Sequence, residues 1–205
     1  MSDKSNPYRK ADHFTKAAKS AGFPARSVFK LEEIDQRTKL LKPGQRVLDL
    51  GAAPGSWSMY AARQIGPKGR LLAIDLSEIA ASLGPNATFV QGDAFAIESE
   101  LFVEHGPFDV VLSDMAPNTS GNRDADRAKS FDLVMRALEV ARAHGKPGSS
   151  FVAKIFMGPE YEEARRELRK DYAEVRTLRP ESVRKNSVEV FLVAVGKKTA
   201  APDAV

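Results

Sequence analysis

The sequence has no cysteine, and its 205 residues include only three histidines. Without cysteine the chain forms no disulfide bond, has no thiol nucleophile and builds no cysteine-based zinc site. His13, His105 and His144 are too widely spaced to form a ligand pair on one helix, so we predict no metal site. No apolar run approaches the roughly 20 residues of a membrane-spanning helix, and residues 1–20 lack the apolar middle of a signal peptide. We therefore expect a cytoplasmic protein that does not enter the membrane.

Charge of one sign is concentrated at the amino terminus. The whole chain carries 31 Lys and Arg against 27 Asp and Glu, a net charge of +4. Residues 1–30 alone hold seven basic residues against two acidic ones, so this segment is suited to a phosphate-rich partner. We expect one domain over residues 1–205, with residues 1–30 as a basic extension and helix and residues 197–205 as a flexible tail.

Short β-branched and apolar runs alternate with longer segments of helical periodicity, which predicts an α/β fold with a parallel sheet between helices. Seven strands are expected, at Arg46–Leu50, Leu71–Asp75, Thr88–Val90, Phe108–Ser113, Ser149–Lys154, Ala173–Leu178 and Val188–Val195. Six helices are expected, at Asp12–Ala21, Ser27–Leu41, Trp57–Ile65, Glu98–His105, Arg127–His144 and Glu160–Asp171. The loop between the last two strands is too short for a helical crossover, so the sheet should be mostly parallel with an antiparallel last strand.

The segment VLDLGAAPGSWS, Val47–Ser58, predicts a strand, a tight turn and a helix, with a ligand site at the end of the strand. A dinucleotide-binding fingerprint would need glycine where Ala53 stands, which disfavours an NAD-dependent oxidoreductase. The remaining pattern, an acid followed by G-x-x-x-G from Gly51 to Gly55, resembles motif I of the S-adenosylmethionine-dependent methyltransferases.

Two acids end the next two predicted strands. Asp75 closes the second strand, where its carboxylate can accept both hydroxyls of a ribose, and Asp93 follows the third, where it can meet an adenine amino group. Each acid alone is also compatible with an ordinary loop position. Because the carboxyl ends of parallel strands share one edge, the two acids and the turn together predict a nucleoside pocket.

Three more charged residues are predicted at the same edge. Asp114 leaves the fourth strand, Lys154 ends the fifth, and Glu189 begins the antiparallel seventh strand. Each is compatible with a solvated strand end, but an acid or base at the mouth of an apolar strand is costly unless it is paired. Their convergence predicts a functional patch.

The segments ARSVFKLEEID, VLDLGAAPGSWS, SDMAPNTSG, FVAKIF and RPESVRKNSVEVFLV together resemble the FtsJ-type ribosomal RNA 2′-O-ribose methyltransferases. The resemblance extends from about residue 12 to residue 195 and implies a Rossmann-like class I methyltransferase fold with S-adenosylmethionine as cofactor. It also implies a catalytic Lys-Asp-Lys-Glu tetrad, which maps onto Lys30, Asp114, Lys154 and Glu189. We expect the cofactor to bind at Gly51, Gly55, Trp57, Asp75, Asp93 and Asp114.

For this tetrad we expect Lys154 to accept the proton of the ribose hydroxyl while Asp114 holds it in position. Lys30 would stabilise the developing alkoxide or a phosphate, and Glu189 would orient the ribose. Candidate phosphate contacts are Arg26, Arg184 and Lys185.

The resemblance implies methylation of a uridine in the A loop of 23S ribosomal RNA, within the large ribosomal subunit, by a monomer. Two positions depart from the family pattern. Ser56 replaces a glycine of the ribosomal RNA enzymes, a form found in relatives that methylate tRNA anticodon loops, and Val188 replaces an arginine, removing a possible phosphate contact. A tRNA 2′-O-ribose methyltransferase and a catalytically idle RNA-binding protein therefore stay open as alternatives.

Overall fold

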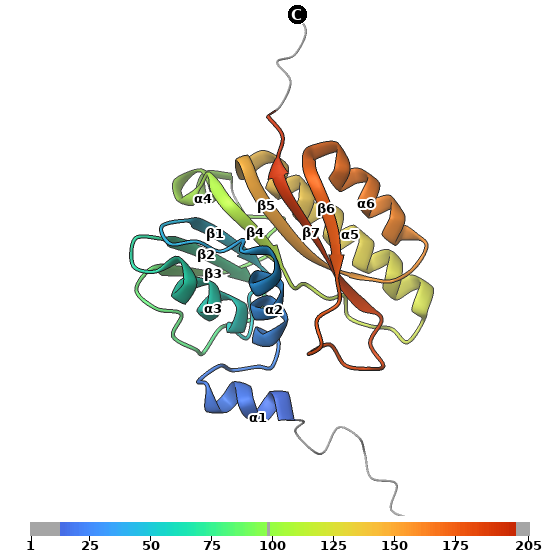
Figure 1. Ribbon diagram of the computed structural model, residues 1–205, viewed down its shortest axis with the longest axis horizontal. Helices are drawn as coiled ribbons and strands as arrows, with labels where there is room; N and C mark the ends of the chain where they lie inside the picture. Colours follow the sequence, from blue (N-terminus) through green and yellow to red (C-terminus); the bar gives the residue numbers. More distant parts are fainter. Residues whose placement is uncertain (1–12, 98, 200–205) are drawn as a thin grey trace, which may run out of the picture.

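Residues 13–97 and 99–199, which the computed structural model describes, form one sheet with helices on both faces (Figure 1). The strands are β1 (Arg46–Leu50), β2 (Arg70–Asp75), β3 (Ala87–Gln91), β4 (Phe108–Ser113), β5 (Gly145–Phe156), β6 (Tyr172–Leu178) and β7 (Glu189–Lys197). Their order is β3-β2-β1-β4-β5-β7-β6. Strands β1 to β5 are parallel, and β7 is antiparallel to both of its neighbours, β5 and β6. The predicted fold is confirmed.

This topology gathers five strand ends and one strand start at a single edge. The carboxyl ends of β1 to β5 lie there together with Glu189, the first residue of β7. We call this the carboxyl edge. It is the edge at which open α/β sheets bind their ligands.

The helices are α1 (His13–Ser20), α2 (Val28–Thr38), α3 (Ser56–Ile65), α4 (Ser99–His105), α5 (Arg123–His144) and α6 (Glu160–Asp171). Apolar side chains of α2 and α3 pack on one face of the sheet, and those of α4, α5 and α6 pack on the other, while α1 packs against α2. Figure 1 shows α1 lying beyond α2, away from the strands. Because both faces are covered, Val47, Leu48 and Leu50 are all buried in β1 without alternation. Among the described residues no helix is long and apolar enough to cross a membrane.

Several element bounds differ from the prediction by one to four residues, and those of α5, α2 and β5 differ most. Helix α5 begins at Arg123, earlier than predicted, because the Asn122 side chain caps it by accepting hydrogen bonds from the next backbone amides. Helix α2 ends at Thr38 because Lys39 adopts a left-handed conformation with φ of 54°. Strand β5 starts at Gly145, directly after α5. Two predicted helix starts, Asp12 and Glu98, lie outside the described residues.

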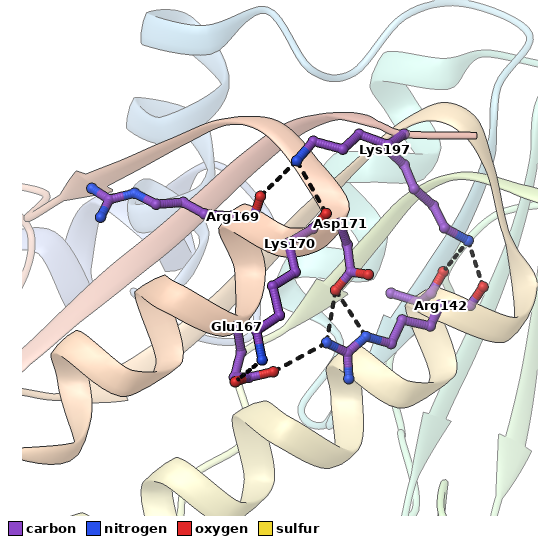
Figure 2. Close-up of polar contacts among 8 residues, drawn as sticks. Arg142, Glu167, Arg169, Lys170, Asp171 and Lys197 are labelled. Carbon is purple, nitrogen blue, oxygen red and sulfur yellow. Dashed lines mark hydrogen bonds and ion pairs between the residues drawn. The ribbon is translucent and has the colours of Figure 1, made fainter. Parts of the chain in front are cut away.

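A polar network joins α5, α6 and β7 at the end of the sheet opposite the carboxyl edge (Figure 2). The Arg142 guanidinium of α5 pairs with Asp171 of α6 at 2.8 Å. The Lys197 ammonium of β7 donates to the carbonyl oxygens of Ala141 and Gly145 at 3.0 and 2.8 Å. A cation is favourable at these positions because the last carbonyls of a helix lack partners within it.

The network includes residues of the predicted carboxy-terminal tail, residues 197–205. Lys197 is part of β7, and the backbone amide of Lys198 donates to the Asp171 carbonyl at 2.7 Å. These two residues of the predicted tail are therefore held in the fold. Residues 200–205 of that tail, and residues 1–12 of the predicted basic extension, lie outside the described residues.

Asp49 is an acid inside an apolar strand. It is fully buried in β1, and its Oδ2 accepts a 2.6 Å hydrogen bond from the Ser58 hydroxyl of α3. Its Oδ1 has no hydrogen-bond partner among the described residues. Burial, together with the negative charges of Asp114 and Asp75, raises the pKa of this carboxyl to about 7. The folded protein therefore keeps this proton to a higher pH than the unfolded chain does.

Replacing Asp49 by asparagine should flatten the pH dependence of stability. An unfolded aspartate titrates near pH 3.9, so the folded protein holds an extra proton between about pH 4 and 7. Stability from this group is fully present below that window and is lost as the pH rises through it, by about 4 kcal/mol at most. The Asp49→Asn variant should lose less unfolding free energy than the wild type as the pH rises, as measured by urea unfolding across this range.

The matched control is Asp132→Asn, which changes an exposed acid of α5. It should keep the pH dependence of the wild type. Equal pH dependence in wild type and Asp49→Asn would show that Asp49 is already ionised at low pH in the folded protein.

Candidate active site

A buried ion pair joins β5 to the end of β4 at the carboxyl edge. Lys154 lies near the end of β5, and its side chain is only 7% exposed. Its ammonium group donates to the Asp114 carboxylate at 2.9 Å and to the Asp114 backbone carbonyl at 2.6 Å. The double contact fixes the position of the lysine nitrogen and compensates a charge that would otherwise be costly to bury.

A second ion pair joins α2 to β7. The Lys30 ammonium lies 2.6 Å from the Glu189 carboxylate, and the two side chains are 13% and 14% exposed. The same ammonium lies 5.7 Å from the ring centroid of Phe191, within the range of a cation–π contact. A helix on one face of the sheet thus supplies a cation to the carboxyl edge.

The strand register places the two ion pairs next to each other. Lys154 of β5 is directly opposite Phe191 of β7, and Glu189 lies two residues from Phe191 on the same face. Such diagonal neighbours in an antiparallel pair are about 7–8 Å apart. The four residues of the predicted tetrad therefore lie together as two adjacent pairs, while their catalytic roles stay predictions.

The glycines of the turn after β1 are required by close packing. Gly51 has φ of +77°, and a Cβ there would lie 2.4 Å from the Met115 side chain. Gly55 has φ of +104°, and a Cβ there would lie 3.0 Å from the Ile79 side chain. Both positions therefore demand glycine on conformational and steric grounds, independently of any ligand.

Two carboxylates border this turn. Asp75 accepts hydrogen bonds from the amides of Ala53 at 2.9 Å and Ser77 at 2.7 Å, and it is half-buried. Asp93 is exposed and accepts from the Phe95 amide at 2.9 Å. Their oxygens have further lone pairs that can accept hydrogen bonds from ligand hydroxyl or amino groups. The predicted neighbours of the nucleoside therefore flank one turn at the carboxyl edge.

Trp57 has a structural environment that the sequence did not reveal. It is 3% exposed, its indole N–H donates to the Ser27 carbonyl at 2.8 Å, and its ring packs 5.6 Å from that of Phe191. It thereby fastens α3 to the segment that starts α2. Its predicted contact with the cofactor stays a prediction.

Ser56, the departure from the family pattern, also has a local role. Its hydroxyl accepts from the backbone amide of Ala25 at 2.9 Å and donates to the Ala25 carbonyl at 3.1 Å. A glycine could make neither bond. The serine thus ties the turn after β1 to the segment before α2, a contact between residues far apart in sequence.

Basic residues lie on the segments that lead into Lys30 and Glu189. The Arg26 guanidinium donates to the Ser182 carbonyl and lies 5.3 Å from the ring centroid of Phe14. Burial and the positive charge of Arg184 lower the pKa of Arg26, and Glu189 opposes this. Arg184 itself and Lys185 are exposed on the loop before β7. The three predicted phosphate contacts therefore lie on segments next to the tetrad.

Sequence reasoning missed the position of Asp49, although the acid of the LDLG motif was visible. Its buried carboxyl lies beneath the turn, and its pKa responds to the charges of Asp75 and Asp114. The signal was an acid in the middle of an apolar strand, which must be paired, neutral or functional.

Comparison with known proteins places the chain in a family. Residues 23–197 match the FtsJ-like methyltransferase family. A Sorangium cellulosum protein named ribosomal RNA large subunit methyltransferase E is 60% identical over 195 residues, covering 95% of this chain and 92% of the relative. A Bdellovibrio bacteriovorus protein of the same name is 50% identical, covering 93% and 99%. A Plasmodium falciparum crystal structure, described as a ribosomal RNA methyltransferase, shares the fold with a TM-score of 0.75 at 24% identity, covering 85% and 98%. On its sequence and its fold, the chain belongs to the FtsJ-like methyltransferase family.

Proposed function

We propose that the protein transfers a methyl group from S-adenosylmethionine to a ribose 2′-hydroxyl of large-subunit ribosomal RNA, with a uridine of the A loop as the target. The observation that carries the proposal is the Lys154–Asp114 ion pair, held at the carboxyl edge beside the turn after β1. The names of the relatives support ribosomal RNA as the substrate. We also propose that the protein acts in the cytoplasm, as a monomer, on the large ribosomal subunit.

The residues at the edge fit S-adenosylmethionine. The turn from Gly51 to Gly55 is built of small residues, which leaves its backbone close to any ligand above it. Asp75 and Asp93 provide the acceptors for ribose hydroxyls and an adenine amino group, and Asp114 follows β4, the strand on the other side of β1. When bound, the cofactor supplies a methyl group on a positively charged sulfur, so the methyl group needs no further activation.

The chemical task left to the protein is to orient a hydroxyl and remove its proton. Lys154 is positioned for this, because its nitrogen is fixed by two hydrogen bonds to Asp114. Only a neutral amine can accept the ribose proton, so in the proposed step the Lys154 ammonium first releases a proton to solvent. Asp114 thus acts on the base by positioning it.

The second ion pair completes the site. The Lys30 ammonium provides positive charge for an alkoxide or a nearby phosphate, and Glu189 can accept a hydrogen bond from the substrate ribose. Their mutual contact at 2.6 Å holds both side chains at the carboxyl edge.

The two alternatives are weakened by specific contacts. The presence of Ser56 favoured a tRNA substrate, but its hydrogen bonds to Ala25 give this serine a structural role that does not depend on the substrate. An idle RNA-binding protein would have no need to bury a charged lysine, whereas Lys154 is buried and paired. Mapping ribose methylation in ribosomal and transfer RNA from cells with and without the gene would decide between the substrates.

Replacing Lys154 by methionine should abolish methyl transfer, because methionine keeps the apolar stem but accepts no proton. General-base catalysis contributes about 10² to 10⁴-fold, so the single-turnover rate at saturating RNA and cofactor should fall by at least about 100-fold. Cofactor affinity, measured by calorimetry, should stay near the wild-type value. The wild-type rate should rise with pH, and that rise should be absent from any residual activity of the variant.

Lys146→Met is the matched control. Lys146 also lies in β5 and pairs with an acid, Asp109, at 2.8 Å, but it sits at the opposite end of the strand. This variant should keep nearly full activity. A Lys154→Met rate within a few-fold of the control would assign proton removal to another group.

Asp75→Ala should weaken binding of S-adenosylmethionine by about 1 to 3 kcal/mol, because the ribose hydroxyls lose a charged acceptor. The turn also loses the hydrogen bond from Ala53 to this carboxylate. Isothermal titration with the cofactor measures the change, and Asp132→Ala, an exposed acid on α5, serves as control. Unchanged affinity would remove Asp75 from the cofactor site.

RNA affinity should fall steeply with salt concentration, while cofactor affinity should not, because phosphate contacts release bound counterions. Arg184 and Lys185 are exposed on the loop before β7 and are the residues to change. Replacing both by alanine should reduce the slope of log affinity against log salt by about 1 to 2. The control, Arg166→Ala and Lys170→Ala on α6, should leave the slope unchanged. A flat salt dependence in the wild type would argue against an RNA surface at this loop.

A further inference from the structure

The loop between β6 and β7, residues 179–188, contains no helix or strand, and it packs against α2. We call it the β6–β7 loop. Ser182 and Val183 of this loop are buried. The Val183 side chain belongs to the same apolar cluster as Val28 and Leu31 of α2. The position of the loop therefore depends on this helix.

Glu33 of α2 makes a charged contact with the backbone of the β6–β7 loop. Its Oε2 accepts a 2.7 Å hydrogen bond from the amide of Glu181, which is 148 residues away in sequence. Its Oε1 forms an ion pair with Arg37, one turn further along α2, and the Glu33 side chain is 19% exposed. The Arg26 guanidinium, just before α2, donates to the Ser182 carbonyl. Because a hydrogen bond to an ionised carboxylate is stronger than one between neutral groups, Glu33 fixes one point of the loop backbone.

The same face of α2 also reaches the tetrad. Lys30 and Glu33 are three residues apart, so their side chains lie next to each other on the helix surface. Lys30 pairs with Glu189, the first residue of β7, while Glu33 binds the amide of Glu181 on the loop that leads into β7. One helix face therefore sets the position of a tetrad residue and of the loop beside it.

The anchored part of the loop directly precedes two exposed cations. Arg184 and Lys185 follow Val183 in sequence and are the loop residues proposed to contact phosphate. A phosphate at these cations and a ribose at Lys30 would belong to one RNA strand, so the two sites must lie at a distance that the strand can span. A loop that is already held in place avoids the entropy cost of being ordered when RNA binds.

We propose that Glu33 is a positioning residue for the RNA substrate. Its carboxylate fixes the β6–β7 loop so that Arg184 and Lys185 meet phosphates of the strand whose ribose lies at the tetrad. The inference rests on the proposed function and adds a residue that does not itself touch the RNA. Glu33 therefore acts on the affinity for RNA and not on the removal of the proton.

The first test compares three variants of α2. Glu33→Ala removes the acceptor and should raise the KM for RNA by about fivefold or more, because binding then has to order the loop. The single-turnover rate at saturating RNA and the cofactor affinity should stay near wild type. Glu33→Gln loses the charge but keeps an oxygen that can accept from the Glu181 amide, so its KM should be within about twofold of the wild type. The control, Glu32→Ala, removes the preceding acid of α2 and should leave all three quantities unchanged.

The second test asks whether Glu33 acts through the two cations of the loop. In a chain that already carries Arg184→Ala and Lys185→Ala, the change Glu33→Ala should raise the KM by less than about twofold, since the contacts that it positions are already lost. Hydrogen exchange without RNA measures the anchor itself. The amide of Glu181 should exchange at least about tenfold faster in Glu33→Ala than in Glu33→Gln, because it has lost its acceptor.

A KM of Glu33→Ala within about twofold of the Glu32→Ala value would overturn the proposal, and so would additive effects of Glu33→Ala and the two loop changes. A Glu33→Gln variant as impaired as Glu33→Ala would assign the effect to the charge and overturn it too. Equal exchange of the Glu181 amide in both variants would show that Glu33 does not hold the loop. A wild-type protein that 2′-O-methylates no RNA would refute the proposed function itself. Since the exchange measurement needs no RNA, the two failures are distinguishable.

Discussion

Because helices cover both faces of the sheet, a charged side chain in a central strand must be paired with an opposite charge or be neutral. The central strands are buried along their length, and a charge within them costs several kcal/mol unless it is paired or neutralised. Lys154 satisfies this constraint near the end of β5 by pairing with Asp114. Asp49 satisfies it in β1 through a raised pKa. The site at the carboxyl edge is therefore a consequence of how the core is packed.

The two ends of the sheet have different roles. At the edge opposite the carboxyl edge, Arg142 pairs with an acid at the end of α6, and Lys197 donates to backbone carbonyls at the end of α5 and just after it. These contacts hold α5, α6 and β7 together. At the carboxyl edge, the charged pairs come from α2, β4, β5 and β7, and their positions depend on the fold being held elsewhere. A site assembled from four elements needs such a rigid frame to keep its geometry.

The sequence predicted the elements and the residues at their ends, because apolar runs and parallel-strand topology determine both. The bounds of β1, β4 and α6 agree with the prediction, and the tetrad residues lie together. The role of Trp57 was not predictable, since its contact with Ser27 depends on how α3 packs against α2. Periodicity predicts the face of a helix or strand on which a side chain lies, but not the residue that it contacts.

The bonds between Ser56 and Ala25 connect the turn proposed to hold the cofactor to the segment proposed to contact RNA. Ser56 opens the helix after the cofactor turn, and Ala25 directly precedes Arg26 on the side proposed for RNA. The Trp57 indole makes a second bond between the same two segments, to the Ser27 carbonyl on the other side of Arg26. The distance from the turn to Arg26 is therefore fixed by two neighbouring side chains of α3, which brace the backbone on both sides of the arginine.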